Sequence, residues 1–224
     1  PASWEAAITA VGAMDQAVTG VMTGKFKNAF CAVRPPGHHA EPNKSMGFCI
    51  FNNAAIGAKI AIGPGAARVA IIDFDVHHGN GTQAAFYSDP SVFFVSTHQE
   101  LIYPGTGYEN EIGAKNGTGT NLNVPMSAGA GDTAFLSVFD ETIIPPLKKF
   151  APEFIIISAG FDAHEADPLA GLSLTTTGFA GITEKIMGLA NEICDGRVVS
   201  TLEGGYNLSA LSDSVRAHVG EMVK

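Results

Sequence analysis

Cysteine, basic residues and charged residues in general are scarce in this sequence of 224 residues. The three cysteines, Cys31, Cys49 and Cys194, are far apart and odd in number, which excludes a disulfide framework and predicts buried thiols in a reducing compartment, the cytoplasm. Charged residues make up 16% and hydrophobic residues 46%, a balance that excludes a disordered chain. No apolar run reaches the roughly eighteen residues of a membrane-spanning helix, so we expect no membrane partner.

Acidic residues outnumber basic ones, 22 to 13, which gives a formal net charge of −9. Binding to phosphate backbones requires clustered lysine and arginine, and the longest basic feature is Lys148–Lys149. The composition therefore excludes a general nucleic-acid binder. A chain of this length can bury one sizeable core, and we expect a single domain over residues 1–224.

Apolar runs of strand length alternate with segments of helical periodicity. We expect strands near 28–33, 68–75, 91–98, 119–124, 153–160 and 197–203, and helices near 3–22, 50–62, 80–88, 132–149, 175–193 and from 207. This alternation predicts an α/β fold with a mostly parallel central sheet and helices on both faces. The strands are apolar throughout, as expected where both faces of a sheet are covered.

Polar, glycine-rich segments follow five of the predicted strands. Their sequences are RPPGHHA, DVHHGNGT, YPGTGY, GFDAHEADP and EGGYN. In parallel α/β sheets, ligands bind outside the carboxyl ends of the strands. We therefore expect the functional site where these five segments meet.

Asp75 and His77 follow one strand and are two residues apart, so both side chains of an extended segment point the same way. Asp162, after another strand, is the best-placed third ligand. Two carboxylates and one imidazole leave a position for water, as in catalytic metal sites. An isolated Asp-x-His could instead be a helix cap and a loop histidine, but its polar surroundings favour a metal. Because Gly79 and His164 stand where a second ion would need carboxylates, we predict one ion.

The pair His38–His39 follows the rigid turn RPPG and can supply both a base for water and an acid for a leaving amine. Simple packing or hydrogen bonding of one ring is the alternative. Asp73 and Asn80 are the candidate orienting partners. A carboxylate raises the basicity of an imidazole more than an amide does, so the histidine that faces Asp73 should keep its proton longer.

The segment EGGYN places a phenol at the end of the last strand. Gly204 and Gly205 let the backbone pass close to a ligand. The hydroxyl of Tyr206 can then stabilise an oxyanion, although an isolated Gly-Gly-Tyr is more often an ordinary turn. The company of the other segments favours the catalytic interpretation.

Together, the segments RPPGHHA, MGFCIFNNAA, DFDVHHGNGTQ, YPGTG, SAGFDAHEADPL and LEGGYN resemble the zinc-dependent histone deacetylases, in the family's order over about residues 28–210. The likeness is greatest to the class II branch and to the bacterial histone-deacetylase-like and acetylpolyamine amidohydrolases. It implies the three-layer arginase/deacetylase fold and hydrolysis of acetyl groups from lysine side chains of proteins or peptides. Family domains are longer, so we expect a partial catalytic domain, shortened at both ends, with an exposed sheet edge.

The resemblance implies that the polar residues at the strand ends form the catalytic set. The ligands of one Zn²⁺, with Fe²⁺ as an alternative ion, would be Asp75, His77 and Asp162. The catalytic groups would be His38 backed by Asp73, His39 backed by Asn80, and the carbonyl-polarising Tyr206. A structural K⁺ or Na⁺ would lie at Asp73, Ser96 and the backbone carbonyls of Asp75 and His77.

The resemblance also implies a tunnel for the acyl-lysine side chain. Phe48 and Tyr103 would be its aromatic walls, Gly47 would lie along its floor and Leu169 at its rim. The polyamine-specific branch carries glutamate at the position of Leu169, so leucine favours an acetylated peptide or protein over an acetylated polyamine. Polyamine deacetylation, a two-manganese ureohydrolase and a non-catalytic acyl-lysine binder are the alternatives.

Overall fold

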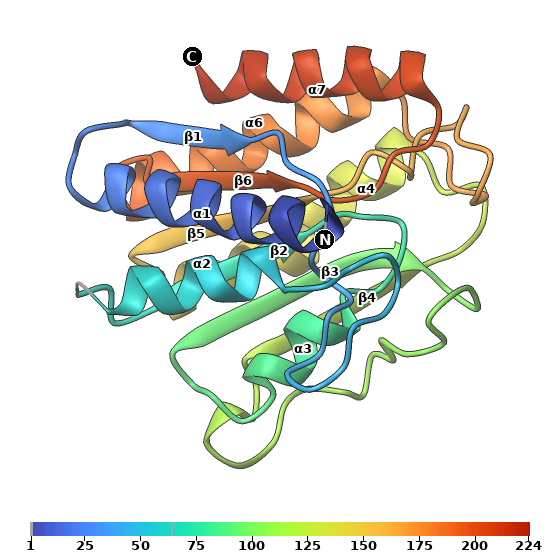
Figure 1. Ribbon diagram of the computed structural model, residues 1–224. Coiled ribbons are helices and arrows are strands. Elements are labelled where there is room, and N and C mark those ends of the chain that lie inside the picture. Colours follow the sequence, from blue (N-terminus) through green and yellow to red (C-terminus); the bar gives the residue numbers. More distant parts are fainter. Residues whose placement is uncertain (1, 64) are drawn as a thin grey trace.

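A six-stranded sheet forms the centre of the computed structural model, which describes residues 2–63 and 65–224 (Figure 1). The strands are β1 (Asn28–Cys31), β2 (Val69–Asp73), β3 (Val92–Gln99), β4 (Asn121–Met126), β5 (Phe154–Ala159) and β6 (Val198–Leu202). Their order across the sheet is β1-β6-β5-β2-β3-β4, and every neighbouring pair of these strands is parallel. The predicted parallel α/β sheet is confirmed.

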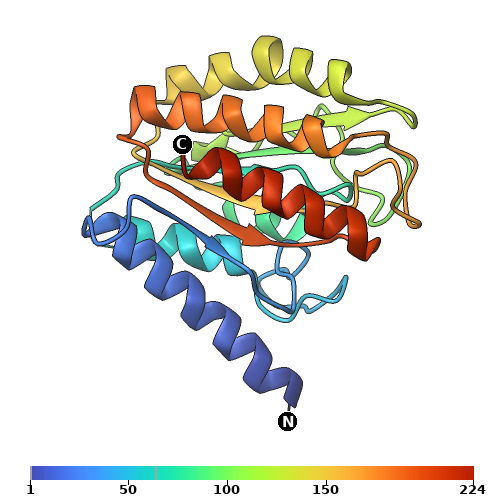
Figure 2. The same cartoon turned by 90° about the horizontal axis from the view of Figure 1, so that it is seen from above.

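Helices cover both faces of the sheet, which gives three layers (Figure 2). One face carries α1 (Ala2–Met22), α2 (Asn53–Ile62) and α3 (Asn80–Phe86). The other face carries α4 (Asp132–Val138), α5 (Ile144–Phe150), α6 (Thr176–Ile193) and α7 (Leu208–Met222). This layering is the one that the resemblance implies.

The apolar strands divide their side chains between two cores, because successive residues of a strand point to opposite faces. In β2, Val69 and Ile71 pack on the side of α1 and α2, whereas Ala70 and Ile72 pack on the side of α4 to α7. All four are at most 1% exposed. Burial on both faces explains why the strand is a continuous apolar run and shows no alternation in sequence.

The helix predicted at 132–149 is interrupted, and this part of the prediction needs correction. A π-helical turn, Phe139–Ile143, separates α4 from α5. Pro145 and Pro146 lack the backbone N–H groups that would bond to carbonyls four residues earlier, so a regular α-helical ladder cannot continue through this segment. The predicted strand at 28–33 likewise ends early, at Cys31, shortly before two prolines.

The topology brings the loops after β2 and β5 together. From β2 the chain continues outward to β3 and β4, and from β5 it continues to β6 on the other side. The carboxyl ends of β2 and β5 therefore lie at the point where the direction of the connections reverses, which is where open α/β sheets form their binding crevice. Asp75 and His77 follow β2 there, and Asp162 follows β5.

The structure shows the state of the three cysteines and the character of the helices. Cys31, Cys49 and Cys194 are all free and buried, as predicted. Within residues 2–63 and 65–224, no helix combines the length and the apolar character needed to cross a membrane.

Candidate active site

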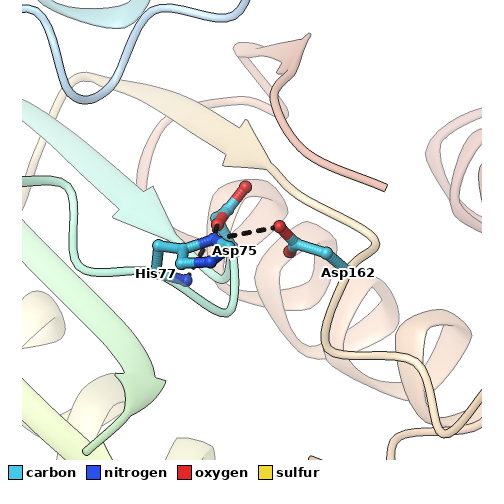
Figure 3. A group of neighbouring side chains, drawn as sticks. All are labelled: Asp75, His77 and Asp162. Atoms are coloured by element: carbon cyan, nitrogen blue, oxygen red, sulfur yellow. Dashed lines mark hydrogen bonds and ion pairs between the residues drawn. The ribbon is translucent and has the colours of Figure 1, made fainter. Parts of the chain in front are cut away.

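Three side chains from two strand ends converge on one point. Donor atoms of Asp75, His77 and Asp162 all lie within 4.8 Å of one another. Nδ1 of His77 lies 3.0 Å from Oδ1 of Asp75 and 3.2 Å from Oδ2 of Asp162. Figure 3 shows Asp75 and His77 beside the end of β2, with the carboxylate of Asp162 reaching toward them from the segment after β5. The structure thus brings together the three predicted metal ligands.

Backbone groups hold the two carboxylates in place. The N–H groups of Val76 and Gly204 donate to Oδ1 of Asp162 and Oδ2 of Asp75, both at 2.9 Å. A Cβ at Gly204 would overlap Oδ2 of Asp162 and lie 2.7 Å from Oδ2 of Asp75. Glycine is therefore required here by the close approach of the backbone to the carboxylates.

The cluster fits a divalent cation by its donors and its charge. Both aspartates are 1% exposed, and Oδ2 of Asp162 accepts no hydrogen bond although it is buried. Burial, followed by the charge of Asp75, raises the pKa of Asp162 to about 7. Burial opposes a charge on His77, but the nearby carboxylates of Asp162 and Asp75 outweigh that effect and raise its pKa to about 10. Two close, buried carboxylates thus attract a positive charge, which is a proton on His77 or a metal ion.

His38 pairs with a carboxylate. Its Nδ1 lies 2.9 Å from Oδ2 of Asp73, which is fully buried. Burial disfavours the charged imidazole, but the charges of Asp73 and Asp75 outweigh it and raise the pKa of His38 well above its usual value. His38 is therefore the member of the pair that holds a proton.

His39 pairs with an amide whose orientation is fixed from behind. Nδ1 of His39 lies 2.8 Å from Oδ1 of Asn80. Nδ2 of Asn80 donates to Oε1 of Glu41 at 2.9 Å and lies 3.3 Å from the sulfur of Met46, so Oδ1 must be the atom that faces the imidazole. An amide oxygen only accepts, so Nδ1 of His39 carries the proton and Nε2 has a free lone pair.

The surroundings of the two histidines shift their pKa values in the directions that their hydrogen-bond partners also favour. Burial, followed by the positive charge of His38, lowers the pKa of His39 to about 3. His39 is therefore neutral at pH 7, while His38 is charged. The rings lie 4.0 Å apart between centroids, so both act on one space.

A cavity of about 310 Å³ opens in front of this cluster. Its lining residues are Pro36, His38, His39, Gly47, Phe48, Asp75, His77, Tyr103, Leu169, Gly204 and Tyr206. Phe48, Tyr103 and Leu169 are exposed at its mouth by 72%, 47% and 55%. Burial, followed by the charges of Asp75 and Asp162, raises the pKa of the Tyr206 phenol above its usual range, so the hydroxyl stays a hydrogen-bond donor.

Gly47 lines the cavity and has a positive φ of 56°, and a Cβ there would overlap the ring of His39, so a side chain does not fit at this position. Its place along the floor of a substrate tunnel stays a prediction. A larger groove of about 670 Å³ lies between α2, α3 and residues 40–45. None of the candidate ligands or catalytic histidines lines that groove, so its size alone does not make it the active site.

Two of the predicted site residues, Gly205 and Ser96, do not line the cavity. Gly205 lies outside the lining of the cavity, and a Cβ there would meet Leu211 and Phe161, whereas Gly204 lines the cavity. Ser96 stands beside Asp73 across β2 and β3, as a shared cation would require, and its Oγ lies 2.9 Å from Nδ1 of His98. The monovalent cation site stays a prediction.

His78 points away from the cavity. Its Nδ1 lies 2.8 Å from Oγ1 of Thr106, and its Nε2 lies 3.1 Å from Oε1 of Gln83. Burial, followed by the charge of His98, lowers the pKa of His78 to about 3. The second histidine of the pair after β2 thus stabilises the loop that carries Tyr103 and is not a ligand.

Sequence reasoning missed Glu203, the first residue of EGGYN. Its carboxylate is 1% exposed and accepts hydrogen bonds from the N–H groups of Gly37 and His38, at 2.6 and 3.1 Å, and from the hydroxyl of Ser158 at 3.2 Å. Burial raises the pKa of Glu203 to about 7. Glu203 therefore joins the end of β6 to the turn that carries the catalytic histidines. A glutamate directly after an apolar strand was the only signal.

Comparison with known proteins places this geometry in a family. A model of the histone deacetylase domain matches residues 1–222. The chain is 54% identical over 197 residues to histone deacetylase 10, chloroplastic, of Oryza sativa subsp. japonica, covering 86% of this chain and 44% of that protein. It is 45% identical over 205 residues to a probable deacetylase of Archaeoglobus fulgidus, covering 92% and 57%. The crystal structure of the HDA15 HD domain superposes with a TM-score of 0.94 at 43% identity, covering 98% of this chain and 62% of that one.

The chain belongs to the histone deacetylase family, a family of hydrolases, and has the arginase/deacetylase fold. The predicted resemblance is confirmed. The chain spans 44% to 57% of the length of the two curated relatives described above. Because the rice relative is named as chloroplastic, the cytoplasmic location stays a prediction for this chain.

Proposed function

We propose that this protein is a metal-dependent deacetylase that hydrolyses N-ε-acetyl-lysine in peptides or proteins to lysine and acetate. The observation that carries the proposal is the meeting at one cavity of three side chains able to ligate a metal, two histidines with different hydrogen-bond partners, and a phenol. These groups suit different parts of amide hydrolysis. All of them except Asp162 line the same cavity of about 310 Å³, and Asp162 contacts His77, which does line it.

Asp75, His77 and Asp162 would hold one Zn²⁺, with Fe²⁺ as an alternative. The buried oxygen of Asp162 that lacks a hydrogen bond, and the two carboxylates around one imidazole, support this assignment. When bound, such an ion supplies Lewis-acid chemistry: it polarises a carbonyl and lowers the pKa of water. K⁺ or Na⁺ at Asp73 and Ser96 would be structural.

The two histidines divide the proton transfers. The free lone pair on Nε2 of His39 can accept a proton from the attacking water, since Asn80 keeps the other ring nitrogen protonated. His38, charged through Asp73, can give a proton to the amine as the C–N bond breaks. The water oxygen forms the new C–O bond, and the departing lysine leaves as the amine.

Tyr206 stabilises the charge that develops on the carbonyl oxygen. Its phenol lines the cavity and stays protonated at neutral pH, so it can donate a hydrogen bond to that oxygen. A donor of this kind contributes about 10²–10³ in turnover. The substrate side chain would pass between Phe48 and Tyr103, whose rings are exposed at the mouth.

The exposed Leu169 at the rim supports a peptide substrate over a polyamine. A leucine offers no charge partner for the free ammonium group of an acetylated polyamine. We expect faster turnover of an acetyl-lysine peptide than of N-acetylputrescine, measured with both substrates on the same preparation. The opposite order would favour the polyamine alternative.

Tyr206→Phe tests the mechanism directly. We expect turnover of an acetyl-lysine peptide to fall by about 10² or more, with unchanged metal content by elemental analysis, because the phenol does not ligate the ion. The control is Tyr108→Phe, a change at an exposed tyrosine outside the cavity, which should have little effect. Full activity of Tyr206→Phe would refute the oxyanion role, and peptide binding without acetate release by the wild type would refute catalysis.

A further inference from the structure

Asp167 is a buried carboxylate outside both the metal cluster and the lining of the cavity. It is 7% exposed and lies in the loop after β5. Its oxygens accept three backbone hydrogen bonds. Oδ2 accepts from the N–H groups of Tyr206 at 2.7 Å and Asn207 at 3.3 Å, and Oδ1 accepts from the N–H of Leu169 at 3.0 Å.

These bonds join two loops that serve different parts of the cavity. One loop carries Leu169 at the rim, and the other carries the phenol of Tyr206. Nδ2 of Asn207 adds a bond to the carbonyl of Ala166 at 3.0 Å, so the two loops are also tied at the residue before Asp167. Bonds to an ionised acceptor are stronger than those between neutral groups, which makes the carboxylate the main link.

The backbone of Tyr206 has few other constraints. Residues 203–207 form neither helix nor strand, and Gly205 has a φ of 139°, in the region that favours glycine. Gly204 is held by its hydrogen bonds to Asp75 and Phe161, so the conformational freedom of the backbone just before the tyrosine comes from Gly205. Among the described residues, the N–H of Tyr206 donates only to Asp167.

We infer that Asp167 is a positioning residue: its carboxylate holds the backbone of Tyr206 so that the phenol faces the cavity, and it sets the rim at Leu169 relative to that phenol. The inference rests on the proposed function for what the phenol does. The competing explanation is a purely structural one, because Asn207 is the N-cap residue of α7 and a carboxylate near a helix N-terminus stabilises the helix.

Asp167→Asn separates the two explanations when it is compared with a matched control. The substitution keeps the shape but replaces one accepting oxygen with an NH₂ group that cannot accept. The control is Asp132→Asn, because Oδ1 of Asp132 accepts from the N–H of Thr175, the N-cap residue of α6, at 2.8 Å. Both variants loosen the start of a helix, but only the first loosens Tyr206.

We expect Asp167→Asn to lower kcat about tenfold at unchanged metal content, and Asp132→Asn to leave kcat unchanged. In the Tyr206→Phe background, Asp167→Asn should have little further effect on kcat, since the hydroxyl that it positions is gone. An equal loss of kcat in both backgrounds, or no loss in the Tyr206 background, would overturn the inference. Should Asp167→Asn not fold, Asp167→Glu, which keeps the charge but shifts it by one methylene, takes its place in the same cycle.

A second readout does not depend on deacetylation. The protein has four tyrosines, so 3-fluorotyrosine labelling gives four ¹⁹F resonances, and the one absent from Tyr206→Phe belongs to residue 206. Asp167→Asn should shift or broaden that resonance, and Asp132→Asn should not. If the resonance of residue 206 is unchanged in Asp167→Asn, the positioning role is refuted, even when the wild type is an active deacetylase. If the resonance shifts in Asp167→Asn but the wild type has no deacetylase activity, only the proposed function is refuted.

Discussion

Replacing Gly204 by alanine adds one methyl group where the backbone passes the carboxylates of Asp75 and Asp162, two of the three candidate metal ligands. The new Cβ would lie 2.7 Å from Oδ2 of Asp75, whereas ordinary contact begins at 3.4 Å, and it would overlap Oδ2 of Asp162 more severely. The carboxylate of Asp75 would have to move by 3.4 − 2.7 = 0.7 Å. It has little room to do so, because Oδ1 accepts from the N–H of His77 at 2.9 Å and the residue is 1% exposed.

A displacement of this size exceeds the roughly 0.2 Å tolerance of metal–ligand distances. We expect Gly204→Ala to weaken Zn²⁺ binding by about 10–100-fold and to lower the free energy of unfolding of the metal-free protein by about 1–3 kcal/mol, from overpacking. Competition with a chromophoric chelator gives the affinity, and urea titration gives the stability.

The control for this change is Gly188→Ala in α6. A Cβ at Gly188 meets nothing within 4 Å, so alanine should stabilise the helix by about 0.5–1 kcal/mol and leave Zn²⁺ affinity unchanged. If Gly204→Ala bound Zn²⁺ as tightly as the wild type, Asp75 and Asp162 would not both be ligands.

Two further predictions concern stability. Burial lowers the pKa of His218 to about 3, and the ring is held neutral between the hydroxyls of Thr183 and Ser200. Since the unfolded state takes up this proton below about pH 6.5 and the folded state does not, His218 makes the protein less stable as pH falls, by about 3 kcal/mol between pH 7 and pH 4. His218→Gln should remove that part of the acid dependence in urea titrations at both pH values, and an unchanged pH dependence would contradict it. Ile156→Ala should cost about 2–5 kcal/mol in the same assay, because Ile156 is fully buried between the sheet and α1 and α2, and a loss below about 1 kcal/mol would contradict the packing described above.

The order of elements was predictable because it depends on local pattern. Apolar runs such as the one at residues 69–72 report burial on both sides of a sheet, and helical periodicity reports a covered face. The interruption of the helix at Phe139–Ile143 was missed, although Pro145 and Pro146 stand next to it. Two prolines after a helical run can end a helix or widen one turn, and the packing of α5 against the core decides between these outcomes.

The sequence predicted which residues make up the candidate site, but local pattern did not predict which of them pair with one another. Asp75 and His77 are neighbours in sequence, so their common direction follows from an extended backbone. The pairing of His39 with Asn80 followed only from the resemblance, since nothing local relates residues that lie 41 positions apart. Glu41, which orients that amide, gave no signal at all in the sequence.

By itself, the sequence determined that parallel strands would deliver polar, glycine-rich loops to one edge, because periodicity and chain order are encoded locally. Only the tertiary structure decided which loops meet: strand order places β2 beside β5, so that Asp162 reaches His77, and β6 beside β5, so that Asp167 reaches the backbone of Tyr206. The physical reason is that contacts between distant segments depend on how the two cores pack around the sheet, and that packing is a property of the whole chain.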